Sequence, residues 1–587
     1  MKSSQALLAG ALVLASGVTS LRAQTTYTYA GANNGTWSAP ANWTPNTSYP
    51  GNGGAAGNTD IALINSVAAN QNINYDSAAS GFLGTLTINE ATAGVTNQVT
   101  LQRSLTLTNA LSLGASAGTA QIAIGGNILT DAAGINVSAG GNLTASSGTI
   151  NGNLNMTGGT INASNLVLGG ATNSIGGVTT GSTIANLTLA SPGVNQTLAL
   201  GSGVSLTGTL TIKTGGAQQT TTVSSVSNLS GSINLNEANN FRFPTLQLGS
   251  NLTANNITAT SGATASTNTN RFLIDVNSNT LTLTNAAGFT ATTTNTYGTV
   301  TTPVVVSWIL NDSGTGGVFQ APSFNLSPTA QGNFTNNGVT VQGDLTLQAT
   351  GGNGTANVLS NTAGTISATS TFLYSGNAAA ATPATLASNR AIGSLRVQNG
   401  ALQLSTAITA AGANVAVTNG GTLDLHAFNL AATSAALTLS DTNGTSGTII
   451  NSTAATGSSR VTLSAASMTF NPGGMLTYTL SNTDNTANML ISLTGSFTKG
   501  TIGTGLYTLN FIGGMVGQTY DLVNFGSNGG FSASDFTITG TAGTLSFNGG
   551  ELDFTVGAVP EPSTWAAVLL SVGVVLFATR RSLRRAA

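Results

Sequence analysis

The sequence predicts an all-β protein: a right-handed parallel β-helix, or solenoid, with a C-terminal β domain and a single C-terminal transmembrane helix. Composition is the first reason, because only 5% of the 587 residues are charged and 75 are glycine. The frequent polar residues are Thr, Asn and Ser, which favour strands and turns over helix surfaces. Regular alternation of apolar and polar residues is the second reason, and an apolar C-terminal segment is the third.

Short segments that alternate apolar and polar residues recur along the chain, and Thr is the usual polar residue in them. Alternation at period two predicts a strand with one buried face and one wet face. Pairs such as Gly-Asn, Gly-Gly and Asn-Gly lie between these segments and supply the positive φ that tight corners need. The clearest predicted strands are 84–88, 104–108, 185–189, 208–212 and 279–284.

Stacking of many such strands is the simplest way to bury their apolar faces, since a strand so short cannot do so alone. The spacing is regular in one stretch, where the interval from Leu143 to Leu154 equals the interval from Ile150 to Ile161. These features favour a solenoid. An array of β-sandwiches remains the alternative, because periodicity does not distinguish a corner from a hairpin turn.

The chain divides into five predicted parts. They are a signal peptide (1–23), an N-terminal cap rich in aromatic residues (24–80), a β-repeat solenoid (81–465), a C-terminal β domain with longer strands (466–557) and a C-terminal sorting segment (558–587).

The N-terminal segment has the features of a cleaved signal peptide. Lys2 precedes an apolar run from Ala6 to Val18, and Ala23 before Gln24 suits signal peptidase. We therefore expect export by the secretion machinery and a mature chain that begins near Gln24. The chain has no cysteine, so disulfides and thiolate chemistry are excluded.

The C-terminal segment combines a proline motif, an apolar run and a basic end. Pro560 and Pro562 favour extended backbone, so we expect a helix to begin only beyond them. The uncharged run from Trp565 to Ala578 reaches the low end of the roughly 17–25 residues of a membrane span when its polar flanks are included. The predicted membrane anchor comprises Trp565, Leu569, Leu570, Val574, Val575, Leu576 and Phe577, and the predicted cytoplasmic stop comprises Arg580, Arg581, Arg584 and Arg585. The alternative is a buried helix of a globular domain.

This order of features resembles the PEP-CTERM sorting signal of bacterial envelope proteins, over about the last thirty residues. The resemblance implies that Pro560, Glu561 and Pro562 are recognised by an exosortase, an integral-membrane enzyme that removes the tail. The protein would then be its substrate, anchored transiently in the inner membrane before it reaches the cell surface or an exopolysaccharide matrix. The same segment is also known as an ice-binding protein C-terminal domain. Residues 35–62 and 466–557 resemble autotransporter-type β-repeat proteins.

Motifs that carry catalytic chemistry are scarce. Ser116 lies in a Gly-x-Ser-x-Gly pattern, and His426, the only histidine, follows Asp424 at a spacing of two. A match of this kind is expected by chance in a chain so rich in Gly and Ser, and we predict no catalytic triad. Because the sequence has no cluster of histidines, no phosphate-binding loop and no Gly/Asp-rich calcium nonapeptide, we also predict no cofactor and no metal.

Two acidic residues near the C-terminus and the overall charge also bear on function. Glu551 and Asp553 lie on one predicted strand face, as a glycosidase pair could, but alternation with Leu552 and Phe554 also explains them. Residues 24–559 contain 8 basic and 15 acidic residues, a net charge of about −7. Nucleic acid and anionic lipid are therefore poor candidate partners.

Three functional hypotheses follow. The leading one is an exported, non-enzymatic surface or matrix protein, an adhesin or scaffold associated with exopolysaccharide. The second is carbohydrate or ice binding by Thr-rich strand faces, represented by Thr85/Thr87, Thr106/Thr108 and Thr209/Thr211. The third is an envelope polysaccharide hydrolase or lyase.

Overall fold

The computed structural model describes residues 24–558 and 562–583, apart from short internal segments, and divides the chain into two compact units, Met1–Phe324 and Asn325–Ala587. The internal segments that it leaves out are 54–57, 66–68, 191–192, 215–218, 226–228, 238–243, 262–269, 287–288, 291–292, 296–305, 327–331, 349–357, 362–363, 367–370, 377–382, 389–391, 410–413, 441–445, 454–459 and 504. The predicted signal peptide lies outside the described residues.

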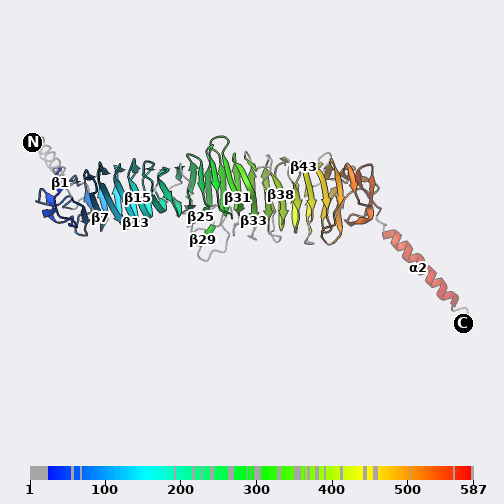
Figure 1. Cartoon of the computed structure of the whole chain (residues 1–587). Helices are drawn as coiled ribbons and strands as arrows, with labels where there is room; N and C mark the ends of the chain where they lie inside the picture. The colour runs from blue at the N-terminus through cyan, green and yellow to red at the C-terminus, as the bar shows by residue number, and fades with distance from the viewer. Residues whose placement is uncertain are drawn as a thin grey trace, which may run out of the picture. The chain divides into compact units, whose positions relative to one another are not determined.

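Within each unit the strands stack side by side as the coils of a parallel β-solenoid (Figure 1). Leu86, for example, pairs in parallel with Leu111 of the next coil. Parallel neighbours cannot be joined by tight hairpins, so the β-sandwich alternative is wrong and the predicted solenoid is confirmed. All five strands predicted most clearly are present, as β6 (Thr85–Glu90), β8 (Leu105–Leu107), β17 (Ser182–Leu189), β20 (Thr209–Lys213) and β27 (Thr280–Leu283).

In the first unit, three sheets supply the faces of the coils, and η1 (Pro40–Asn42) precedes β2. The first sheet contains β1 (Thr26–Tyr29), β2 (Trp43–Thr44), β3 (Ile61–Ile64), β6 (Thr85–Glu90), β9 (Leu111–Ala115), β12 (Ile135–Val137), β14 (Leu154–Met156), β16 (Thr172–Ile175), β18 (Gln196–Leu200), β21 (Gln219–Ser225), β23 (Pro244–Leu248), β26 (Asn270–Asp275) and β30 (Val306–Asn311). The second contains β4 (Gln71–Tyr75), β5 (Phe82–Leu83), β7 (Thr96–Leu101), β8 (Leu105–Leu107), β10 (Thr119–Gly125), β11 (Ile128–Asp131), β13 (Gly141–Asn151), β15 (Thr160–Leu168), β17 (Ser182–Leu189), β19 (Val204–Leu206), β20 (Thr209–Lys213), β22 (Ser232–Glu237), β25 (Ile257–Ser261) and β29 (Thr293–Asn295). The third contains β24 (Leu252–Ala254), β27 (Thr280–Leu283), β28 (Phe289–Thr290) and β31 (Val318–Leu326).

In the second unit, two sheets carry the described strands, and η2 (Ala533–Asp535) precedes β52. One sheet contains β32 (Gly332–Asn337), β34 (Val358–Asn361), β37 (Ala384–Ser388), β39 (Gly400–Leu404), β42 (Gly421–Asp424), β44 (Thr448–Ile450), β46 (Met475–Leu480), β49 (Tyr507–Gly513) and β52 (Phe536–Gly540). The other contains β33 (Thr340–Gln348), β35 (Thr365–Ile366), β36 (Thr371–Ser375), β38 (Ser394–Gln398), β40 (Ile408–Thr409), β41 (Val415–Val417), β43 (Leu430–Leu439), β45 (Val461–Phe470), β47 (Met489–Leu493), β48 (Ser496–Lys499), β50 (Thr519–Asn524), β51 (Ser527–Gly529), β53 (Gly543–Asn548) and β54 (Glu551–Val556).

The regular spacing noted in the sequence is not the length of a coil. Leu143 lies in the second sheet and pairs with Ile161, whereas Leu154 lies in the first sheet and pairs with Asn173. The interval from Leu143 to Leu154 therefore joins one face of a coil to another, and a full coil is longer. Coils lengthen further elsewhere, as the pairing of Phe272 with Trp308 shows.

The core of the first unit is a set of stacked columns. One column runs through the first sheet by successive pairings and is almost completely buried: Leu86, Leu111, Ile135, Leu154, Asn173, Leu198, Val223 and Leu248. Burying each aliphatic side chain stabilises the fold by about 1.5–3 kcal/mol relative to exposure. Asn173 fits in this column because its side chain donates to the Gly170 carbonyl at 2.9 Å and accepts from the Leu154 amide at 3.2 Å.

Aromatic side chains fill the interior of the first coils. Trp37 and Trp43 are almost completely buried, with ring centroids 4.6 Å apart, and Tyr75 packs against Trp37 at 5.0 Å. The indole N–H of Trp37 donates to the Pro50 carbonyl, so this buried donor is satisfied. Parallel stacking already includes β1 and β3, within the range predicted as a cap.

The predicted C-terminal β domain continues the same parallel stacking, since β46 pairs with β49 and β49 with β52. Only the last described strands depart from it: β54 pairs antiparallel with both β50 and β53. The pairing with β50 contains a β-bulge between Asp521 and Val523, which shifts the register by one position.

The predicted transmembrane helix is wrong. The C-terminal helix α2 (Pro562–Leu583) is present, but among the described residues no helix is long and apolar enough to cross a membrane. The physical reason is that the uncharged run, Trp565 to Ala578, is short, and α2 continues into Arg580 and Arg581 in its last turn. The helix also begins earlier than predicted, at Pro562, because proline is well suited to the first turn.

Candidate functional site

The predicted sorting and anchor residues are described only in part. Pro560, Glu561, Arg584 and Arg585 lie outside the described residues, as does the side chain of Trp565. The described apolar side chains of the predicted anchor are exposed on α2: Leu569, Leu570, Val574, Val575, Leu576 and Phe577.

A triad of Ser116, His426 and Asp424 is not assembled around the histidine. The Asp424 carboxylate accepts the backbone N–H groups of His426 and Ser452 at 3.0 and 2.9 Å, and the Gln403 amide at 2.9 Å. His426 lies in the turn after β42 with a φ of 43°, and its Nδ1 contacts Gln403 and Ser452. Asp424 therefore holds the turn after β42 that contains His426.

The predicted Thr-x-Thr pairs do not form one flat array. Thr85 and Thr87 lie on β6 in the first sheet, whereas Thr106 on β8 and the Thr209/Thr211 pair on β20 lie in the second. Their neighbours in adjacent coils are mixed, and one outer row consists of Thr188, Thr211, Asn234 and Thr258.

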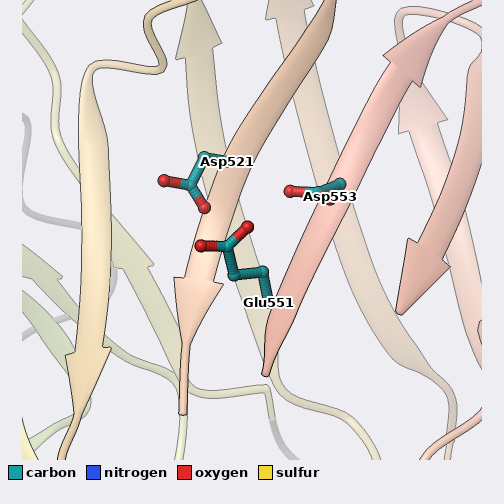
Figure 2. A group of neighbouring side chains, drawn as sticks. All are labelled: Asp521, Glu551 and Asp553. Atoms are coloured by element: carbon teal, nitrogen blue, oxygen red, sulfur yellow. The ribbon is translucent and has the colours of Figure 1, made fainter. Parts of the chain in front are cut away.

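A group of three carboxylates lies where the antiparallel strand β54 meets β50 (Figure 2). Asp521 on β50 is directly opposite Asp553 on β54, and Glu551 lies two positions before Asp553 on the same face. One oxygen from each of the three carboxylates lies within 4.8 Å of the other two. We call Asp521, Glu551 and Asp553 the acidic cluster.

Local sequence explains why these side chains share a face. In β54, Leu552, Phe554 and Val556 point into the core and are buried, so Glu551 and Asp553 point the other way. In β50 the bulge places both Leu522 and Val523 inside, which leaves Asp521 and Asn524 facing Asp553 and Glu551.

The three carboxylates differ in their partners. Asp521 pairs with Arg460, whose Nη2 is 3.0 Å from Oδ2 and also donates to the Asp521 backbone carbonyl at 2.9 Å. Among the described residues, no group donates a hydrogen bond to the side chain of Asp553, which is only 9% exposed. Burial raises the pKa of the Asp553 carboxyl, and the negative charges of Asp521 and Glu551 raise that pKa further.

Two further oxygens at the same place lack donors. Asp521 Oδ1 and Asn524 Oδ1 are both buried and accept no hydrogen bond within the described part of the chain. Leaving a buried acceptor unpaired costs about 1–3 kcal/mol, and like charges directly opposite each other on neighbouring strands are also destabilising. The acidic cluster therefore carries an unfavourable free energy that no described protein group offsets apart from Arg460.

Sequence reasoning identified Glu551 and Asp553 but explained them by strand alternation, and it did not include Asp521. Asp521 is distant from Glu551 along the chain, so only the antiparallel register brings them together. Acidic residues are scarce in this chain, at sixteen in all, and three of them meet at this point. No protein-family model matches this chain, and no curated protein matches it in sequence.

Proposed function

We propose that this chain is an exported, non-enzymatic protein of the cell surface or extracellular matrix. In this proposal an exosortase-like enzyme recognises Pro560, Glu561 and Pro562, and the β-solenoid then serves as an adhesin or scaffold within exopolysaccharide. The observation that carries the proposal is the solenoid itself, whose described coils present mostly uncharged Thr, Ser and Asn side chains to solvent. Such a stack presents one kind of surface over many coils, which suits a structural role.

Surface delivery tests the sorting claim. The matched variants are a deletion of residues 560–587, a replacement of Pro560, Glu561 and Pro562 by alanine, and Asp484→Asn as a control between β46 and β47 of the second unit. We expect the first two variants to be retained or misrouted and the control to reach the surface. Normal surface delivery of the alanine variant, measured by protease accessibility on intact cells, would contradict recognition of the motif.

A second candidate function is carbohydrate binding, favoured by the mixed outer row of Thr188, Thr211, Asn234 and Thr258. Neighbouring coils lie about 4.7–4.9 Å apart, so the row offers hydroxyl and amide groups at regular intervals. Replacing Thr211 and Asn234 by alanine together should weaken retention on immobilised exopolysaccharide. Equal retention of the variant and the unmodified chain would dispose of this candidate.

A further inference from the structure

We propose that the acidic cluster of Asp521, Glu551 and Asp553, together with Asn524, binds one divalent cation, and that Ca²⁺ fits it best. The inference goes beyond the proposed function, because it concerns the stability of the second unit and not the delivery of the protein.

The acidic cluster and Asn524 offer oxygen ligands suited to a divalent cation. Carboxylate and amide carbonyl oxygens are the groups that Ca²⁺ and Mg²⁺ take in proteins. In Figure 2, Glu551 reaches from β54 towards Asp521 and Asp553 points towards β50, and one oxygen from each carboxylate lies within 4.8 Å of the other two. Asn524, opposite Glu551 in the ladder, adds a buried carbonyl oxygen that has no donor among the described residues.

Distances favour Ca²⁺ over Mg²⁺. Oxygens bound to one Ca²⁺ at about 2.3–2.6 Å are at most about 5 Å apart, which accommodates the 4.8 Å limit within which the three carboxylate oxygens lie. For Mg²⁺, with bonds of about 2.0–2.1 Å, the largest separation is only about 4.2 Å. A Mg²⁺ ion would therefore require a tighter arrangement if the oxygens approach that limit.

The net charge of the acidic cluster and Arg460 also suits a divalent cation. Three ionised carboxylates carry −3, and Arg460 supplies +1 through its contact with Asp521 Oδ2. A remaining charge of −2 matches a divalent cation. Arg460 engages one side of Asp521, so Oδ1 stays available as a ligand.

Asp553 is the observation that separates this cluster from an ordinary acidic surface. Its side chain points across towards β50 (Figure 2), is 9% exposed and accepts no hydrogen bond from any described residue. Beside it, Asp521 Oδ1 and Asn524 Oδ1 are buried acceptors without a described donor, and a bound cation removes the cost of leaving them unpaired.

The test uses the full chain, with CaCl₂ as the probe, MgCl₂ for selectivity and NaCl at matched ionic strength as the control. Calorimetric titration should show one equivalent of Ca²⁺ bound, with at least tenfold weaker binding in Asp553→Asn and Glu551→Gln. Asp484→Asn, which removes one carboxylate between β46 and β47 of the same unit, should bind as the unmodified chain does.

Thermal unfolding gives a second readout, which does not require that Ca²⁺ binding release a measurable heat. With chelator, Asp553→Asn should unfold at the same or a higher temperature than the unmodified chain, because it removes a repulsive charge. With Ca²⁺ the order should reverse. The proposal is overturned if Ca²⁺ shifts both proteins equally, if NaCl gives the same shift as CaCl₂, or if Asp553→Asn retains full affinity.

Discussion

Asp131 in the stacked coils and Asp553 on the antiparallel strand β54 have different hydrogen-bond partners. In the first unit, Asp131 is completely buried, and it accepts backbone N–H groups from Leu111, Ala133 and Gly134 at 2.6, 3.0 and 3.0 Å. In the second unit, Asp553 is 9% exposed and accepts none from the described residues. At Asp131, the amides of a turn point at the carboxylate. In the β50–β54 ladder the backbone amides already pair between strands, so Asp553 has no backbone donor among the described residues.

The largest expected effect comes from removing a carboxylate that holds a turn. Asp131→Ala leaves buried amides of Leu111 and Gly134 without acceptors, so we expect a loss of about 4 kcal/mol in the free energy of unfolding. Urea unfolding followed by circular dichroism measures the change. Asp131→Asn, which keeps one acceptor oxygen, is the matched control and should lose less. A loss below about 1 kcal/mol in the alanine variant would show that the hydrogen bonds to the Asp131 carboxylate contribute little to stability.

An intermediate effect is expected at Asp535, which lies in η2. This carboxylate contacts the Lys499 ammonium and accepts the Ser532 backbone N–H at 2.7 Å. These interactions lower the pKa of Asp535 to about 2, the Lys499 contact having the larger effect. Asp535→Asn should cost about 1 kcal/mol of the free energy of unfolding at neutral pH.

The pH dependence of that cost has a definite sign. A carboxyl whose pKa is lowered by folding stabilises the protein above its unfolded pKa of about 4, and that contribution is lost as the pH falls towards 2. The difference in unfolding midpoint between the unmodified chain and Asp535→Asn should therefore shrink between about pH 4 and pH 2. A difference that stays constant over this range would show that the carboxylate charge is not responsible.

A smaller effect, of opposite sign, is expected at the acidic cluster. In chelating buffer, Asp553→Asn should raise the free energy of unfolding by about 0.5 kcal/mol, because it removes the charge opposite Asp521. The same urea experiment measures it. A clear loss of stability in chelator would mean that the Asp553 carboxylate has a stabilising protein partner. Asp553 and Asp131 would then not differ in this respect.

The smallest effect is expected on the outer face of the coils. Thr211 lies between Thr188 and Asn234 on the solvent side of the second sheet, so Thr211→Val should change the free energy of unfolding by less than about 0.5 kcal/mol. A large loss would show that hydroxyl contacts between coils, and not only the buried columns, hold the stack together.

Much of the fold could be predicted because it depends on local patterns. Alternation identifies strands such as β20, and a strand so short requires stacking, so the solenoid follows. The coil length did not follow, because Leu143 and Leu154 look equivalent in sequence but belong to different sheets. The transmembrane prediction failed because polar flanks were counted towards a short uncharged run.

The acidic cluster was beyond sequence reasoning for a different reason. Glu551 and Asp553 are neighbours on one strand and are visible as a pair, but Asp521 joins them through an antiparallel register. The bulge between Asp521 and Val523 also places Asn524 on the same face, and a bulge of this kind leaves no clear mark in an apolar and polar pattern. A site that depends on the register between two distant strands can be identified only from the structure.

The most direct test of the account is an experimental structure of the full chain in millimolar CaCl₂. We predict one cation between Asp521, Glu551 and Asp553, with metal to oxygen distances of about 2.3–2.6 Å and with Arg460 still bound to Asp521 Oδ2. A structure in which the guanidinium of Arg460 or water alone fills the space between the carboxylates would contradict it.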